Sequence, residues 1–423
     1  PQPMAWRAGG AGPGGRAMGC GGSTAGGRAA GFHSAYALEE KLGKGTYGQV
    51  WACRDLRTQE RLAVKIICLC RCGPPWLRRP NQKSSSSSRA RWRARGRAAE
   101  AVAARSRAER EELRRRAHAE AELWIRVGKH EHCVELHRVF MDSMLCYLVM
   151  EPCERSVVKA LEEKWPWPVE ADVLRVVYEV LLALSHVHSR GLVHRDVKPD
   201  NVLLGGADGS VTKLCDFGLA AQLPPPGAEP LQEVVGTAPY MAPEMLAGGG
   251  HADRVDVWSL GATAYVMLFG RFPYETSPSS TVKEVIVKGA PPPRYRAVGS
   301  HPGPSLLAER MVRMLLVRIP EKRPSASGML CSLLGQELAR VSEAAALSAR
   351  RPGSVADSAE LPASPSLLPV LLAAKREIEY FRAPSSSYGI DEILEKRAHQ
   401  ERRRRWTLPS LRPQDEGPVA AAA

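Results

Sequence analysis

Four polar side chains near the middle of the chain could together handle a phosphate group. Asp196, Lys198 and Asn201 follow an apolar helical pattern, and Asp216 follows two short apolar runs. The turn-forming residues between those runs predict a hairpin, which would return Asp216 to the side of Asp196 and Asn201. Carboxylate and amide oxygens suit Mg²⁺, and an ammonium suits phosphate oxygens. The sequence therefore predicts a site for phosphate and Mg²⁺ chemistry.

The motifs in this stretch resemble the catalytic core of the eukaryotic serine/threonine protein kinases. The run from His194 to Asn201 matches H-R-D-L-x-x-x-N, with Val197 in the leucine position, and the run from Asp216 to Gly218 matches D-F-G. The resemblance implies a bilobal α+β fold. A small, mainly antiparallel sheet and one helix would form the amino-terminal lobe, and the larger carboxy-terminal lobe would be mainly helical. Within the family, the motifs are most similar to the calcium/calmodulin-dependent and calcium-dependent group.

The resemblance implies a role for each of the polar residues. Asp196 would accept the proton of the substrate hydroxyl, Lys198 would contact the γ-phosphate of ATP, and Asn201 and Asp216 would hold Mg²⁺. Lys198, two residues after the base, is typical of serine/threonine rather than tyrosine kinases, and Thr237 supports this assignment. The expected reaction transfers the γ-phosphoryl group of ATP to serine or threonine hydroxyls of protein substrates. The alternative is a nucleotide-binding scaffold, or pseudokinase, that signals by docking.

A glycine-rich turn between two predicted strands would cover the phosphates of ATP. It has the spacing G-x-G-x-x-G-x-V and continues as a strand, whereas a dinucleotide fingerprint would open a helix. Lys65, in an apolar strand that matches V-A-I-K, would hold the α- and β-phosphates. Backbone groups of Glu151 and Cys153, which follow the gatekeeper Met150, would bond adenine. The full set of predicted nucleotide-binding residues is Leu42, Gly43, Lys44, Gly45, Thr46, Tyr47, Gly48, Gln49, Val50, Ala63, Lys65, Glu120, Met150, Glu151, Cys153 and Leu203.

A helix expected over residues 109–127 must supply the carboxylate that pairs with Lys65. We choose Glu120, with Glu122 as the alternative, because Glu120 lies one helical turn before Trp124 and shares its face. The resemblance further implies that four side chains stack as an internal spine: Trp124, Leu136, His194 and Phe217.

The segment after D-F-G contains no residue that could be phosphorylated. Residues 219–236 include no Ser, Thr or Tyr, although kinases with an Arg before the catalytic Asp, here Arg195, generally neutralise it with an activation-loop phosphate. We predict that Glu233 supplies the counter-charge permanently and makes the activity constitutive. Three more residues are expected to have structural roles: Asp256, which would anchor the catalytic loop, and Glu244 and Arg323, which would form an ion pair.

Composition divides the chain into three parts. Residues 1–35, rich in Gly and Ala, are expected to be disordered, and residues 36–335 form the predicted kinase domain, with 68–107 as a basic, disordered insert. Residues 336–423 are predicted to be a largely disordered tail, with a helical stretch to about Ala349 and a possible amphipathic helix over 367–381. Residues 71–116 hold fifteen Lys or Arg and four acids, so most of the net charge of +14 is local. This distribution does not favour a nucleic-acid partner.

The ten cysteines show no disulfide-framework spacing, and no apolar run approaches the ~20 residues of a membrane span. The expected setting is a reducing cytoplasm, and the expected state is a monomer. If translation starts at Met18, an N-myristoylation pattern predicts membrane attachment through lipids on Gly19 and Cys20. Two groups of possible zinc ligands lack paired C-x-x-C spacing, which argues against a zinc site: Cys68, Cys70 and Cys72, and His130, His132, Cys133 and His137.

Overall fold

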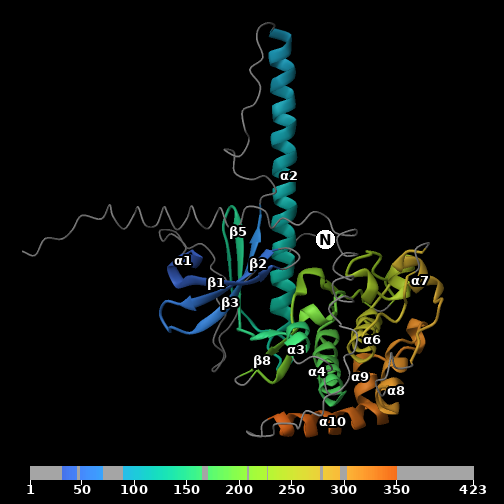
Figure 1. The fold of residues 1–423 in the computed structure, drawn as a ribbon. Coiled ribbons are helices and arrows are strands. Elements are labelled where there is room, and N and C mark those ends of the chain that lie inside the picture. Colours follow the sequence, from blue (N-terminus) through green and yellow to red (C-terminus); the bar gives the residue numbers. More distant parts are fainter. Residues whose placement is uncertain are drawn as a thin grey trace, which may run out of the picture.

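The computed structural model describes residues 31–44, 48–69, 89–163, 170–206, 209–225, 227–276, 280–295 and 303–349. These residues form two lobes, one built on an antiparallel sheet and one mainly helical, so the predicted bilobal α+β fold is confirmed (Figure 1). The predicted lipidation at Gly19 and Cys20 and the predicted helix over 367–381 lie outside the described residues.

Five strands form the sheet of the amino-terminal lobe, in the order β1-β2-β3-β5-β4, and all neighbours are antiparallel. Their bounds are β1 Tyr36–Lys44, β2 Gly48–Asp55, β3 Arg61–Cys68, β4 Leu136–Met141 and β5 Leu145–Met150. Every residue of β5 is buried, as expected of a strand covered on both faces. The register sets Lys65 opposite Leu148 and Ala63 opposite Met150.

Phe32 covers the face of the sheet that is turned away from helix α2. Phe32 belongs to α1 (Phe32–Ala35) and stacks on Tyr147 at a ring-centroid distance of 4.4 Å and on Tyr36 at 5.4 Å. Alternate residues of β3, Val64 and Ile66 among them, join the same apolar cluster. The prediction that disorder extends to residue 35 is therefore wrong for residues 32–35. These residues form a helical turn because Phe32 packs on the apolar face of the sheet.

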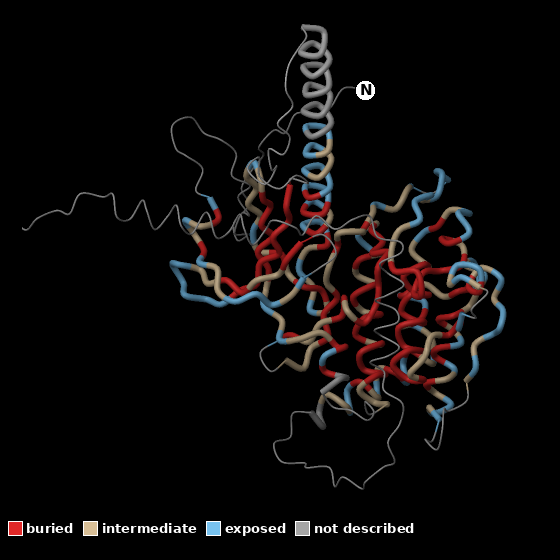
Figure 2. Tube along the Cα trace, turned by 45° about the horizontal axis from the view of Figure 1, so that its top comes forward, coloured by how far each residue is buried: buried red, intermediate tan, exposed pale blue. Residues whose placement is uncertain are grey.

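Helix α2 runs from Arg89 to Val127 and begins well before the expected start at Glu109. Its amino-terminal part extends beyond the sheet (Figure 1), and the buried residues among its described side chains begin at Ala117 (Figure 2). Residues 89–107, predicted as part of a disordered insert, are therefore helical. The prediction was wrong because it rested only on the low apolar content of this stretch, which cannot form a core. Ala, Arg and Glu have high helix propensity and can form a helix without one.

The carboxy-terminal lobe is built around α6 (Arg254–Phe269), in which Val255 and every later residue are buried. Helices α4 (Glu170–Ser189) and α8 (Leu306–Leu315) pack against it. The predicted hairpin is present as β8 and β9, and β10 pairs with β7. The remaining elements are β6 Arg155–Ser156, α3 Val157–Glu163, β7 Leu192–Val193, β8 Val202–Gly205, β9 Val211–Leu214, β10 Ala221–Gln222, α5 Pro243–Ala247, α7 Val282–Lys288 and α9 Ala326–Cys331, with 3₁₀ turns at Pro199–Asn201, Phe217–Leu219, Ala238–Tyr240 and Pro320–Lys322.

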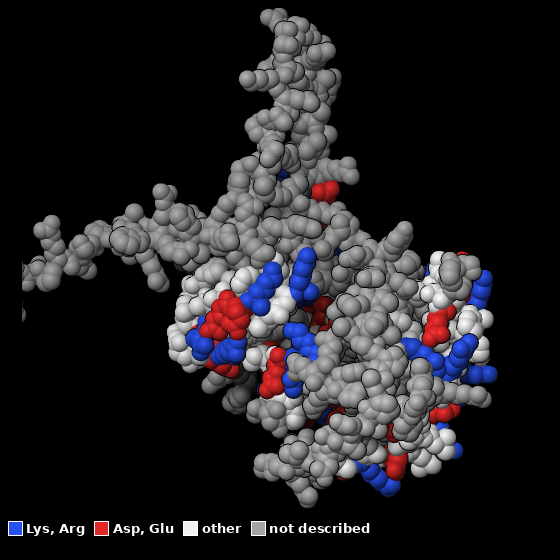
Figure 3. Space-filling model, viewed as in Figure 1, with Lys and Arg blue, Asp and Glu red and all other residues white. Residues whose placement is uncertain are grey.

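The last described helix, α10 (Leu333–Ala349), packs on α4 and carries the fold past the predicted end at residue 335. The expected helix to Ala349 is confirmed, but it belongs to the lobe, because Leu338 and Ser342 are buried. None of the described helices is both long and apolar enough to cross a membrane. On the face shown in Figure 3, acidic and basic side chains of the described residues lie interspersed.

Candidate active site

The segment between β7 and β8 carries the predicted catalytic residues and is held by Asp256 of α6. The Asp256 carboxylate accepts hydrogen bonds from the backbone N–H groups of His194 and Arg195, each at 2.8 Å, and lies 2.9 Å from His188 Nε2. Burial opposes the charged form of Asp256, but these partners outweigh it and hold the pKa of the carboxyl below its usual range. The predicted anchoring role of Asp256 is confirmed.

Asp196 lies at the centre of a buried polar network. Its carboxylate accepts hydrogen bonds from the Lys198 ammonium at 2.6 Å and from the Thr237 hydroxyl at 2.7 Å, and Lys198 Nζ lies 2.8 Å from Thr237 Oγ1. Asn201 Nδ2 donates to the same carboxylate at 3.0 Å. Three donors fix the orientation of the carboxylate, as a positioned general base requires. Asp196, Lys198 and Asn201 lie together as predicted, whereas the direct contact of Thr237, 41 residues further along the chain, was not predicted.

Lys65 of β3 pairs with one carboxylate from each lobe. Its ammonium lies 2.6 Å from Glu120 of α2 and 2.7 Å from Asp216. The predicted Lys65–Glu120 pair is confirmed, whereas the alternative, Glu122, lies on the surface 3.4 Å from His118. Burial opposes the charge on Lys65, but Asp216 and Glu120 outweigh it and raise the pKa of the ammonium. Burial also raises the pKa of Glu120. In Asp216 the same effect is outweighed by Lys65, which lowers the pKa to about 2.

The aromatic spine connects α2 to the D-F-G segment. The Phe217 ring lies between Trp124 of α2, at a centroid distance of 5.7 Å, and His194, at 5.2 Å. Leu136 is buried in the same apolar cluster. The position of Glu120 on α2 therefore depends on how Phe217 is packed.

Four apolar residues of the predicted nucleotide-binding set lie together. Ala63 and Met150 are buried in one cluster, and Val50 and Leu203 pack against it. Gly48 of β2 lies so close to the Ile66 carbonyl of β3 that any added Cβ would collide with it. Other predicted residues lie on β1 and β2 (Leu42, Gly43, Lys44 and Gln49), whereas Gly45, Thr46 and Tyr47 lie outside the described residues.

The Glu151 side chain ties the hinge to both lobes, although we expected only its backbone to matter. Its carboxylate lies 3.0 Å from Lys213 Nζ of β9 and accepts the Glu135 backbone N–H at 2.7 Å. Lys213 also donates to the Glu131 carbonyl oxygen at 2.7 Å. No motif implied a partner for the Glu151 side chain, so its contact with Lys213, 62 residues further along the chain, was not predicted.

The oxygen atoms of Asn201 and Asp216 fit Mg²⁺. The Cys215 backbone N–H donates to the Asn201 carbonyl at 3.0 Å, which places Asp216 beside Asn201. Asn201 commits its Nδ2 atom to Asp196, so its amide oxygen is the side-chain atom that could face a cation. An ionised carboxylate and an amide oxygen form the kind of hard donor set that Mg²⁺ prefers.

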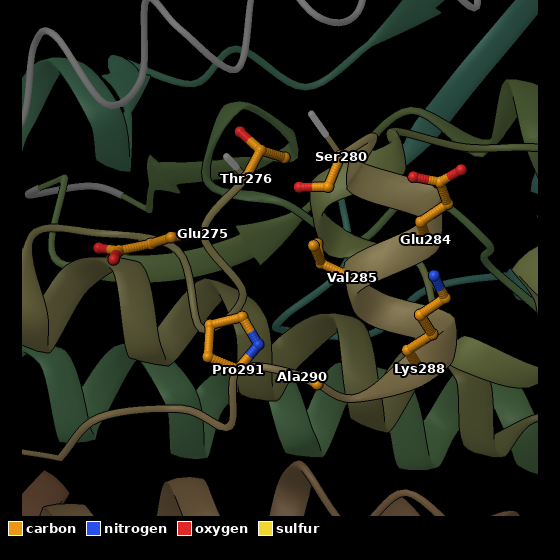
Figure 4. A pocket seen from close by; sticks show the side chains of 8 residues that line it. All are labelled: Glu275, Thr276, Ser280, Glu284, Val285, Lys288, Ala290 and Pro291. Atoms are coloured by element: carbon orange, nitrogen blue, oxygen red, sulfur yellow. The ribbon is translucent and has the colours of Figure 1, made fainter. Parts of the chain in front are cut away.

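Three other features of the described residues lie apart from this site: an ion pair, the candidate zinc ligands and a pocket. The predicted Glu244–Arg323 pair is confirmed at 2.7 Å and is structural. No three His, Cys, Asp or Glu side chains of the described residues are gathered as a metal site, and Cys70 and Cys72 lie outside that part of the chain. A pocket of about 390 Å³ lies beside α7, where Glu284 and Lys288 line one side and Pro291 the other (Figure 4). It contains none of the predicted site residues.

Comparisons with known proteins agree with this geometry. The sequence profile of the protein kinase domain matches residues 86–333, more than half of the chain. The chain is 36% identical over 204 residues to a probable serine/threonine-protein kinase of Zea mays, covering 48% of this chain and 31% of that protein. It is 27% identical to ribosomal protein S6 kinase alpha-1 of Rattus norvegicus (71% of this chain, 35% of that protein). It is 32% identical to a probable myosin light chain kinase of Dictyostelium discoideum (48% and 58%). In each comparison the chain spans less than two thirds of the relative.

Proposed function

This chain belongs to the protein kinase family, and from that premise we propose that it transfers the γ-phosphoryl group of ATP to serine or threonine hydroxyls of protein substrates in signalling. The network around Asp196 carries the proposal. There a carboxylate, the Lys198 ammonium and the Thr237 hydroxyl lie within 2.8 Å of one another. Phosphoryl transfer depends mainly on positioning and charge neutralisation, and this network supplies both.

The contacts suggest a distinct role for each residue. Asp196 would accept the proton of the attacking hydroxyl, while Lys198 would neutralise charge on the transferred group. Lys65, held by Glu120, would bind the α- and β-phosphates of ATP. Mg²⁺, when held by Asn201 and Asp216, would neutralise further negative charge on the phosphates.

The alternative function is a scaffold that binds nucleotide without catalysis. The pairs of Lys65 argue against it, because Glu120 holds this phosphate-binding lysine from α2 and the lysine lies 2.7 Å from the D-F-G aspartate, Asp216. A scaffold has no need for a general base held by three donors.

Phosphate transfer from labelled ATP to a mixed protein substrate would test the proposal. The full chain should be active, and Asp196→Asn should lose at least about 100-fold, the low end of what general-base catalysis contributes. Glu337→Gln is the matched control, since Glu337 lies on the surface of α10. It should leave the rate unchanged. A full chain that binds ATP but transfers no phosphate under any condition would support the scaffold instead.

Two finer assignments complete the proposal. We propose membership of the calcium/calmodulin-dependent group, in which residues 367–381 would form an autoinhibitory or calmodulin-binding helix. The test is whether calcium with calmodulin raises the rate of phosphate transfer above the basal rate of the chain alone. We also propose a cytoplasmic monomer that attaches to membranes through lipids on Gly19 and Cys20. Mass spectrometry of protein from eukaryotic cells would overturn the attachment if Gly19 were internal or unmodified.

A further inference from the structure

Arg195 is a buried cation directly beside the catalytic aspartate. Its side chain is 6% exposed, and its backbone adopts a left-handed conformation with φ of 66°. The backbone N–H donates to Asp256, and Nε donates to the Leu219 carbonyl oxygen at 2.7 Å. These contacts hold the guanidinium in place, but a carbonyl oxygen does not neutralise it. A buried charge requires a counter-charge.

Glu233 supplies that counter-charge from the activation segment. Its Oε2 atom lies 3.1 Å from Arg195 Nη1. Thr237 follows Glu233 after only three intervening residues. The Thr237 side chain forms hydrogen bonds with both Asp196 and Lys198. Among the intervening residues, Gly236 adopts φ of 121° and lies against the Arg195 carbonyl, where an added Cβ would come within 2.6 Å. The Arg195–Glu233 pair therefore lies where the activation segment meets the catalytic loop.

The rest of the segment is held by contacts that also need no phosphate. Its start pairs with β7 through β10, and Gln222 accepts a hydrogen bond from Arg126 of α2 at 2.8 Å. Near its end, Leu231 and His251 exchange backbone hydrogen bonds at 3.1 and 2.9 Å. Residues 219–236 include no Ser, Thr or Tyr, so phosphorylation within them cannot supply the missing charge.

We propose that Glu233 is a positioning residue for phosphoryl transfer, which acts through Arg195 to hold Thr237 against Asp196 and makes the kinase active without phosphorylation of its activation segment. The inference rests on the proposed kinase function. The opposing consideration is that Glu233 is 73% exposed, and exposed ion pairs contribute little. Here, however, only the acid is exposed. Removing it would leave a buried guanidinium without its carboxylate.

The test uses the full chain made in bacteria, treated with phosphatase and confirmed as unphosphorylated by mass spectrometry. The wild type should transfer phosphate, and Glu233→Gln should lose roughly tenfold in kcat, a modest value for a charge-assisted contact with one exposed partner. Its ATP affinity should stay unchanged, and thermal unfolding should show that the variant remains folded at the assay temperature. Glu233→Asp should recover part of the loss. Glu229→Gln, an exposed acid of the same segment, should behave like the wild type.

Two further measurements separate positioning from a merely structural effect. In an Arg195→Met background, Glu233→Gln should cause no additional loss, because the two residues act as one unit. High salt should reduce wild-type activity toward that of Glu233→Gln and affect the variant less, since salt screens exposed charge. The salt measurement needs no change at the buried Arg195, so it remains informative if Arg195→Met fails to fold.

Several outcomes would overturn the inference. It fails if Glu233→Gln matches Glu229→Gln, or if Glu233→Gln costs as much in the Arg195→Met background as in the wild type. A wild type that is silent alone but active after incubation with a eukaryotic extract and ATP would overturn only this inference. A wild type that is silent in both conditions would also overturn the proposed function.

Discussion

At the scale of single residues, His130 shows how packing selects a protonation state. Its ring stacks on His186 at 4.4 Å and lies 5.8 Å from His132. Burial, followed by repulsion from these two histidines, lowers the pKa of His130 to about 4. His186 bonds the Val127 carbonyl at the end of α2 at 2.7 Å. Uncharged His130 therefore supports the junction between α2 and α4.

We expect the folded state to lose stability as the pH falls from about 6.5 toward 4. A histidine whose pKa is lowered on folding binds more protons when unfolded, so its contribution is complete above pH 6.5 and is lost below it. The ring is only partly buried, so the effect should be on the order of 1 kcal/mol. Urea unfolding at pH 7.5, 6 and 5 measures it. His130→Asn should flatten the slope, and the exposed control His118→Asn should not. Equal slopes in all three proteins would contradict the assignment.

Some residues of the candidate active site could be placed from the sequence, and others could not. Lys65, Glu120 and Asp196 were predictable, because motif spacing and one helical turn determine where they lie. The contacts of Thr237 and of the Glu151 side chain, with partners 41 and 62 residues away, were not predictable, because no motif implied a partner for either side chain. Spacing identifies the type of residue at a position, and a distant contact follows from it only where a motif implies both partners.

At the scale of elements, one ion pair connects α5 to the 3₁₀ turn that follows α8. The Arg323 side chain is fully buried and forms two bonds to Glu244, at 2.7 and 3.2 Å. Its Nε also donates to the Val317 carbonyl oxygen at 2.8 Å. The pair holds the end of the activation segment to the helical lobe.

Glu244→Gln should lower the free energy of unfolding by about 3–5 kcal/mol, because it leaves the Arg323 guanidinium buried without its carboxylate. Urea denaturation measures the loss. Glu309→Gln on α8 is the control, since its pair with Arg313 is more exposed and should contribute less than about 1 kcal/mol. Equal losses in the two variants would show that burial does not determine the strength of these pairs.

Element boundaries were harder to predict than element types. β3, β5 and the β8–β9 hairpin follow from apolar runs bounded by turn residues. The early start of α2 and the packing of α10 on α4 could not be predicted in this way. Apolar patterns indicate which residues can form a core, but not where a charged helix begins or which surface a terminal helix covers.

At the scale of the whole molecule, residues far apart in sequence assemble the site. Lys65 and Glu120 lie 55 residues apart. The Leu69 backbone N–H donates to the Met144 carbonyl at 2.8 Å, and Arg114 reaches the Asp142 carbonyl at 3.4 Å. The end of β3 and the middle of α2 therefore both contact the turn between β4 and β5.

Replacing residues 71–105 with a short Gly-Ser linker should leave the kinase active. We expect kcat/KM within about twofold of the full chain and a melting temperature within about 2 °C, because the contacts that hold Glu120 and Trp124 of α2 lie beyond the replaced residues. Steady-state kinetics and thermal unfolding measure both. The same linker with Glu120→Gln should be strongly impaired. A folded but inactive linker variant would show that the replaced residues take part in catalysis.

For a polymer, the entropy lost when two ends meet grows only with the logarithm of the chain between them. Each doubling of the connection between Lys65 and Glu120 would cost about 0.6 kcal/mol even if all of it behaved as an unstructured chain, whereas breaking a buried pair costs about 3–5 kcal/mol. The length of the connection between β3 and α2 therefore has little effect on the stability of the Lys65–Glu120 pair. The match to the kinase profile begins at residue 86, within this connection, yet Lys65 before it lies 2.6 Å from Glu120 after it. The site is thus assembled by contacts across a connection whose length costs little free energy.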